Sequence, residues 1–107
     1  MRARGRTVRR QPGVMNKQEQ AYALHLEALK REGAILAWWF EGITLRLGHD
    51  CRFTPDFMVQ MRDGTIELHD VKGFMEDDAR VKLATCAQQF PFRVVAIMRD
   101  GTEKEFR

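Results

Sequence analysis

The chain has 107 residues, of which 44% are hydrophobic and 31% are charged, a composition typical of one soluble globular domain. No apolar run approaches the roughly 20 residues of a membrane-spanning helix, and the N-terminus lacks the apolar centre of a secretory signal, so we expect a cytoplasmic protein. The two cysteines form no C-x-x-C pair and have no histidine at zinc-ligand spacing, which argues against a disulfide framework or structural zinc.

The net charge of +3 is unevenly distributed along the chain. Residues 1–13 contain no acid and five arginines: Arg2, Arg4, Arg6, Arg9 and Arg10. Because all 15 acids lie in the rest of the chain, that part is slightly acidic. We expect a disordered basic arm at 1–13 and a single folded domain at 14–107. The arm could bind nucleic-acid phosphates; a solvated tail, an extension ahead of a second start at Met15, or a segment foreign to the native chain are the alternatives.

A helix is predicted directly after the arm. Asn16 can cap its N-terminus, and Gly33 can end it. Tyr22, Leu26 and Leu29 recur at helical spacing and should face the core.

Strands are predicted to follow this helix. Residues 34–48 are rich in strand formers, which indicates one long strand bent by a bulge or turn at Glu41–Gly42. Two further strands are expected near 53–61 and 65–72, joined by an Asp-Gly turn.

The last third of the chain predicts a second helix and a final strand. Acids in the first turn and an apolar stripe indicate a helix after Gly73 that stops at Pro91. Residues 92–98 are typical of a strand buried on both faces, and residues 100–106 could form a short hairpin partner. The length of the connection through the second helix predicts a right-handed crossover and parallel pairing. The expected fold is α/β, in the order αβββαβ, with a mixed sheet of about four strands flanked by two helices.

Two acids and a lysine stand at strand ends where alternation predicts apolar residues. Asp70 and Lys72 share one face of their strand, because residues two apart point the same way. A two-residue turn before that strand would place Asp56 on the opposite face. A three-residue loop with Gly64 in the left-handed conformation, or a bulge at Pro55, would bring it beside Asp70.

Adjacent carboxylates at this position predict a cation site. Their repulsion is unfavourable unless a cation or a shared proton relieves it. Oxygen ligands suit Mg²⁺ or Mn²⁺, which keep waters for a substrate phosphate. Lys72 beside the ion could orient or deprotonate a bound water and neutralise transition-state charge, a combination that cleaves phosphodiesters. A salt bridge between Asp70 and Lys72 at the rim of the core is the alternative.

Pro55-Asp56, followed by Asp70-Val71-Lys72 on the next strand, resembles the PD-(D/E)XK nuclease superfamily. Over about residues 15–98 the chain is similar to small phage or prophage endonucleases of this superfamily, and also to Holliday-junction resolvases and transposase endonuclease subunits. The resemblance implies a restriction-endonuclease-like fold and Mg²⁺- or Mn²⁺-dependent hydrolysis of DNA. It implies Asp56, Asp70 and the Val71 carbonyl as metal ligands and Lys72 as the catalytic lysine.

The resemblance also implies residues on the two helices. Glu19 would support the metal or a water, although a capping box with Asn16 would also explain it. Lys82 and Gln89, nearly aligned on the second helix, are candidates for substrate or water positioning, and a solvated helix edge is the alternative. The expected function is a metal-dependent DNA endonuclease for phage or prophage DNA processing or recombination, acting on branched DNA among other substrates. A catalytically inactive DNA-binding or protein-interaction module is the alternative.

Three other side chains have simpler interpretations. Alternation places His69 on the face opposite Asp70, so we do not expect it to be a metal ligand. Trp38 and Trp39 could stack on bases, but consecutive aromatics in a strand are more often one core residue and one interface residue. The second interpretation suggests a homodimer.

Overall fold

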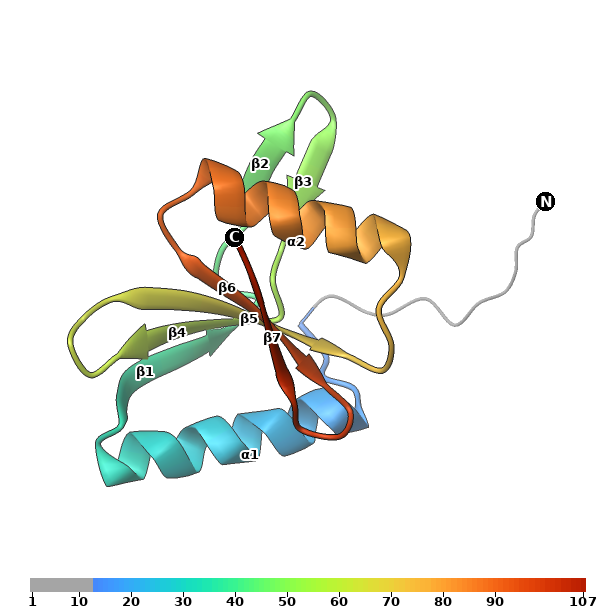
Figure 1. Cartoon of the computed structure of the whole chain (residues 1–107). Coiled ribbons are helices and arrows are strands. Elements are labelled where there is room, and N and C mark those ends of the chain that lie inside the picture. Colours follow the sequence, from blue (N-terminus) through green and yellow to red (C-terminus); the bar gives the residue numbers. More distant parts are fainter. Residues whose placement is uncertain (1–12) are drawn as a thin grey trace.

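The computed structural model describes residues 13–107, and the predicted basic arm therefore lies almost entirely outside the described residues (Figure 1). The described chain forms two helices, α1 (Lys17–Glu32) and α2 (Asp77–Gln89), and the strands β1 (Ile35–Phe40), β2 (Leu45–Gly48), β3 (Cys51–Phe53), β4 (Phe57–Met61), β5 (Ile66–Lys72), β6 (Arg93–Met98) and β7 (Glu103–Phe106).

A mixed five-stranded sheet lies between the two helices (Figure 1). Its strand order is β1-β4-β5-β6-β7, while β2 and β3 form a separate hairpin. Strands β5 and β6 pair in parallel, which confirms the crossover predicted through the second helix. The other neighbours in the sheet are antiparallel. The α/β class and the order helix, strands, helix, strands are thus confirmed, with five strands in the sheet instead of about four.

The prediction of one long strand over residues 34–48 is wrong. This segment forms β1 and β2, which belong to different sheets. Glu41 takes a positive φ of 53°, and the chain then folds back so tightly that a Cβ added at Gly42 would lie 2.7 Å from the Trp39 Cβ. The chain therefore leaves the sheet at Glu41–Gly42. It returns only at β4, after the hairpin.

Local capping signals define both ends of α1. Asn16 Oδ1 accepts a hydrogen bond from the Glu19 backbone N–H at 2.8 Å, and Glu19 Oε1 accepts one from the Asn16 N–H at 2.9 Å, forming a capping box. Gly33 ends the helix with a φ of 82°. Neither α1 nor α2, the helices of the described region, is long and apolar enough to cross a membrane.

Each helix covers one face of the sheet with its own apolar cluster. On one face, Ala23 and Leu26 of α1 pack with Phe57 and Val59 of β4. On the other face, the buried cluster contains side chains of α2, the sheet and the hairpin, among them Leu83, Cys86, Leu68, Val94, Leu45 and Leu47. Both faces of the sheet are therefore covered by apolar side chains. The acids and the lysine of interest lie near the ends of the central strands, where this cover stops.

The turn between β4 and β5 sets the register of the site. The Met61 N–H donates to the Thr65 carbonyl at 2.8 Å, and Gly64 has a φ of 92°. The three-residue loop that would align the two aspartates is therefore the one that forms. Phe57 pairs with His69, so one step further along the ladder brings residue 56 opposite residue 70.

Candidate functional site: two aspartates and a lysine at one pocket

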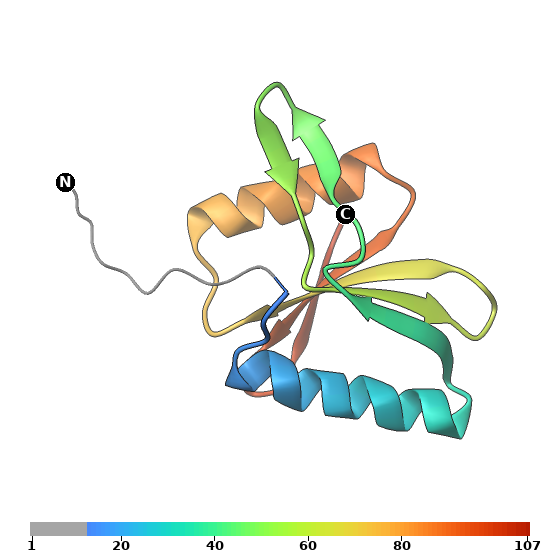
Figure 2. The same cartoon turned by 180° about the vertical axis from the view of Figure 1, so that it is seen from behind.

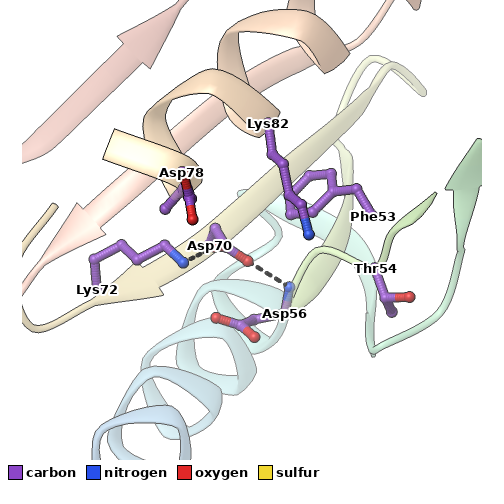
Figure 3. Close-up of a pocket in the computed structure, with 8 residues that line it drawn as sticks. Phe53, Thr54, Asp56, Asp70, Lys72, Asp78 and Lys82 are labelled. Carbon is purple, nitrogen blue, oxygen red and sulfur yellow. Dashed lines mark hydrogen bonds and ion pairs between the residues drawn. The ribbon is translucent and has the colours of Figure 1, made fainter. Parts of the chain in front are cut away.

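A pocket of about 290 Å³ opens where β4 begins and β5 ends, beside the first half of α2 (Figure 3). Four of the residues singled out from the sequence line it together. The complete lining is Phe53, Thr54, Asp56, Asp70, Lys72, Asp78, Ala79 and Lys82.

Asp56 and Asp70 lie side by side at the base of this pocket (Figure 3). Asp70 is only 3% exposed; its Oδ1 accepts a hydrogen bond from the Asp56 backbone N–H at 2.9 Å. Its Oδ2 forms an ion pair with Lys72 Nζ at 2.8 Å. Asp56 is 7% exposed, and its Oδ2 accepts a hydrogen bond from the Val71 N–H at 2.8 Å. The two carboxylates and the ammonium group thus converge instead of diverging to opposite faces.

The Val71 backbone faces the same edge of the strand as the Asp56 side chain. In a strand, the N–H and the C=O of one residue point to the same neighbour. Because the Val71 N–H donates to Asp56, the Val71 carbonyl oxygen is directed toward this edge as well. β4 begins only at Phe57, so this carbonyl lies beyond the β4–β5 ladder.

Glu19 reaches the site from the first turn of α1. Its side chain is 3% exposed and hydrogen-bonds to the Asp56 carboxyl group while it also closes the capping box. The two interpretations of Glu19, helix cap and site residue, are therefore compatible. The cap fixes the position of the side chain, and its carboxylate is then held against Asp56.

The pKa of Asp56 reflects its burial and the negative charges around it. Burial, followed by the negative charges of Asp70 and Glu19, raises the pKa of Asp56 to about 8, against the opposing effect of the Val71 N–H. Asp56 therefore favours its protonated form at neutral pH. Asp70 is neutralised instead by the adjacent Lys72. In the absence of a metal, a proton and an ammonium group provide the positive charge that the acids require.

The donor set fits a hard divalent cation. Two carboxylates and a backbone carbonyl are oxygen ligands of the kind that Mg²⁺ and Mn²⁺ prefer. Within residues 13–107, no three His, Cys, Asp or Glu side chains are grouped closely enough to hold a metal by themselves. A cation bound to Asp56 and Asp70 would thus depend on the Val71 carbonyl and on waters, which is the incomplete protein shell that Mg²⁺ usually has.

The two site residues predicted on α2, Lys82 and Gln89, lie in different surroundings. Lys82 lines the pocket and points from α2 toward the aspartates (Figure 3). Gln89 is not among the lining residues; its side-chain amide donates to the Leu47 carbonyl at 2.8 Å and joins α2 to the hairpin. Asp78 also lines the pocket, although the sequence analysis did not single it out. Its position four residues before Lys82, on the same side of the helix, was the available signal.

The remaining predictions concern residues away from the pocket. His69 lies on the α1 side of the sheet, where the Tyr22 hydroxyl is 2.7 Å from Nδ1 and Glu67 is 2.9 Å from Nε2. Burial lowers the pKa of this histidine. Trp38 donates from Nε1 to Glu27 at 3.0 Å. The five arginines predicted to bind phosphates, Arg2, Arg4, Arg6, Arg9 and Arg10, lie outside the described residues.

Comparisons of this chain with protein-family models, with curated proteins and with solved structures found no significant match.

Proposed function

We propose that the protein is a metal-dependent DNA endonuclease that hydrolyses phosphodiester bonds at the pocket formed by Asp56, Asp70 and Lys72. The observation that carries this proposal is the convergence of two buried carboxylates and one ammonium group at a pocket that is open to solvent. Burying like charges next to each other is unfavourable. A pair of buried acids at the place where two strands reach the surface is therefore best explained by a ligand on which these charges act.

Each side chain has a role that follows from its position. Asp56, Asp70 and the Val71 carbonyl would hold Mg²⁺ or Mn²⁺, which when bound polarises a phosphate and lowers the pKa of a coordinated water. Lys72 keeps its ammonium group next to Asp70, where it can neutralise negative charge that develops on the phosphate oxygens. Glu19 lies against Asp56, so its side chain would support the bound cation or a coordinated water.

DNA is the substrate class that the surroundings favour. Lys82 extends into the pocket from α2 and can contact a phosphate beside the cleaved bond. The P-D and D-V-K residues lie at the ends of adjacent strands between two helices, which supports the proposed membership of the PD-(D/E)XK superfamily and its restriction-endonuclease-like core. By the same resemblance we place the activity in phage or prophage DNA processing or recombination, on branched DNA among other substrates, in the cytoplasm.

An inactive DNA-binding module is the second candidate, and one observation favours it. The Lys72 ion pair and the backbone N–H groups of Asp56 and Val71 satisfy oxygens of both aspartates without any metal. Asp56 and Asp70 would make these same contacts if their role were only structural.

A cleavage assay separates the two candidates. Supercoiled plasmid, linear duplex and a four-way junction are incubated with Mg²⁺, Mn²⁺ or EDTA. We expect cleavage that requires the metal and that falls by about 10²-fold or more in Asp70→Asn and Lys72→Met, because each loses charge that acts in the transition state. DNA binding without cleavage of any substrate would favour the inactive module.

Glu19→Gln tests the role of the helix residue with a matched control. Glutamine can also complete a capping box, so this variant removes the charge while it keeps α1 capped. Glu32→Gln makes the same change at the exposed end of the same helix. We expect slower cleavage only in Glu19→Gln, with unchanged melting temperatures for both. Equal activity of the two variants would limit Glu19 to the helix cap.

A further inference from the structure

The β2–β3 hairpin places two arginines directly opposite each other. Arg46 of β2 is the cross-strand partner of Arg52 of β3, and both side chains are exposed. Like charges at directly opposed positions destabilise a strand pair. Among the described residues, neither guanidinium forms an ion pair with an acid, and the acid at the hairpin tip, Asp50, lies 3.3 Å from His49 Nε2 instead. The hairpin thus presents two positive charges with no negative partner in the described chain.

The opposite face of the hairpin is anchored to the domain. Leu45, Leu47 and Phe53 belong to the buried cluster that contains side chains of α2. The hydrogen bond from Gln89 to the Leu47 carbonyl adds a polar tie between the same two elements. Because alternate residues of a strand face opposite ways, this anchoring turns Arg46 and Arg52 away from α2. The two guanidinium groups therefore extend from a hairpin whose other face is packed against the domain.

The exposed face of the hairpin leads into the pocket. Thr44 and Thr54 form the next cross-strand contact on this face, with their hydroxyl oxygens 2.7 Å apart. Thr54 is also a lining residue of the pocket (Figure 3). Figure 2 shows the hairpin next to α2, with its second strand leading into the segment that enters β4. Two hydroxyl groups and then two guanidinium groups thus follow one another outward from the aspartates.

We propose that this outer hairpin face, defined by Thr44, Thr54, Arg46 and Arg52, binds backbone phosphates of the DNA that flanks the cleaved bond. The inference rests on the function proposed above. Guanidinium groups bind phosphate through paired hydrogen bonds, and threonine hydroxyls also bind phosphates. A phosphate between Arg46 and Arg52 would remove the repulsion that the pair otherwise has. Contacts of this kind position a duplex without reading its bases.

The spacing suits DNA that runs from the pocket along the hairpin. Arg52 is four residues from Asp56, so their Cα atoms are at most about 14 Å apart even if the chain is fully extended. Phosphates of one strand are spaced by about 3.4 Å along the axis of a duplex. The hairpin would therefore contact phosphates within about four base pairs of the cleaved bond.

The test compares two double variants with equal changes in charge. Arg46→Gln/Arg52→Gln removes the proposed contact, and Arg31→Gln/Arg62→Gln removes two exposed arginines from the ends of α1 and β4, away from the pocket. The dissociation constant of a labelled duplex is measured in EDTA over a range of salt concentrations. We expect the slope of log K against log[salt] to fall by about 2 in the hairpin variant, with affinity about 10- to 100-fold weaker near 0.1 M salt. The control should keep the wild-type slope.

Arg46→Glu separates a lost contact from a damaged hairpin. This substitution turns the repulsive pair into an attractive one with Arg52. We expect an unchanged or higher melting temperature together with weaker DNA binding. A lower melting temperature that accounts for the loss of binding would overturn the inference.

The outcomes distinguish this inference from the nuclease proposal. Wild-type affinity and slope in the hairpin double variant, in a protein that cleaves DNA, would overturn the hairpin contact alone. An equal loss in the Arg31→Gln/Arg62→Gln control would also overturn it, because net charge would then explain the effect. Loss of binding in the hairpin variant of a protein that does not cleave would support the contact and overturn the nuclease. No binding of wild-type protein to any DNA would overturn both.

Discussion

Asp56 is the residue where burial and charge oppose each other most strongly. It lies against two other acids, Asp70 and Glu19, and burial alone already disfavours its ionised form. Its alignment with Asp70 was one of the alternatives that the sequence left open, and the loop with Gly64 in the left-handed conformation is the one that forms. Its contact with Glu19 was less accessible from the sequence. The capping signal Asn16-x-x-Glu19 explains that glutamate locally and does not reveal that the helix start lies over the end of β5.

The metal-free protein should lose stability as the pH rises toward 8. The pKa of Asp56 is about 8 in the folded protein and near 3.8 without the folded environment, so the folded state holds a proton that the unfolded chain releases between these values. The free energy of unfolding therefore falls with increasing pH across this window, by up to about 1.4 kcal/mol per unit of pKa difference. Melting temperatures in EDTA from about pH 5 to about pH 9 measure the slope.

Asp56→Asn is the matched variant for this measurement. It keeps the shape of the side chain and removes its titration, so its pH profile should be flatter than that of the wild type. Mn²⁺ should stabilise the wild type more near pH 8 than near pH 5, because a cation binds the ionised carboxylates and competes with the proton. Identical pH slopes for wild type and variant would contradict a buried, protonated Asp56.

At the scale of elements, local signals predicted the helices and long-range contacts decided the strands. Both ends of α1 are set by residues next to them, Asn16 and Gly33, so they could be predicted. Residues 34–48 have strand propensity throughout, and propensity does not say with which partner a strand pairs. The division into β1 and β2 depends on tertiary contacts, since β2 packs on α2 and is not hydrogen-bonded to the five-stranded sheet.

Gln89→Ala tests whether α2 holds the hairpin in this way. The variant loses the hydrogen bond to the Leu47 carbonyl, which should lower stability by about 1 kcal/mol and the melting temperature by several degrees. Gln88→Ala, at the exposed neighbouring position, is the control and should change neither. The cleavage rate at saturating DNA should be the same in both variants. A lower rate with an unchanged melting temperature would instead support the substrate role predicted for Gln89 from the sequence.

At the scale of the whole molecule, the proposed catalytic and DNA-binding residues lie at one end of the sheet, and apolar side chains are exposed on one of its edge strands. The pocket and the hairpin adjoin the end of β5. Strand β1 is an outer strand of the sheet and leaves Trp39 42% and Leu36 49% exposed. These side chains are available for contact with a second copy, so the homodimer suggested by the sequence remains a prediction.

The distribution of charge over the whole chain leads to a prediction about the arm. All 15 acids lie after residue 13, so the folded domain as a whole does not attract DNA, and attraction depends on local groups such as the hairpin arginines. Deletion of residues 1–12 removes five arginines. If each contacts one phosphate, the slope of log K against log[salt] should fall by about 4 to 5.

Combining this deletion with the hairpin double variant tests whether the two contacts are independent. Contacts at separate places should weaken binding additively, so the combined slope should fall by about 6. The cleavage rate at saturating DNA should be unchanged by the deletion, because the acids and lysines of the proposed site all lie after residue 13, while KM should rise. An unchanged salt slope after deletion would exclude the arm from DNA binding. A combined effect no larger than the deletion alone would mean that arm and hairpin compete for the same phosphates.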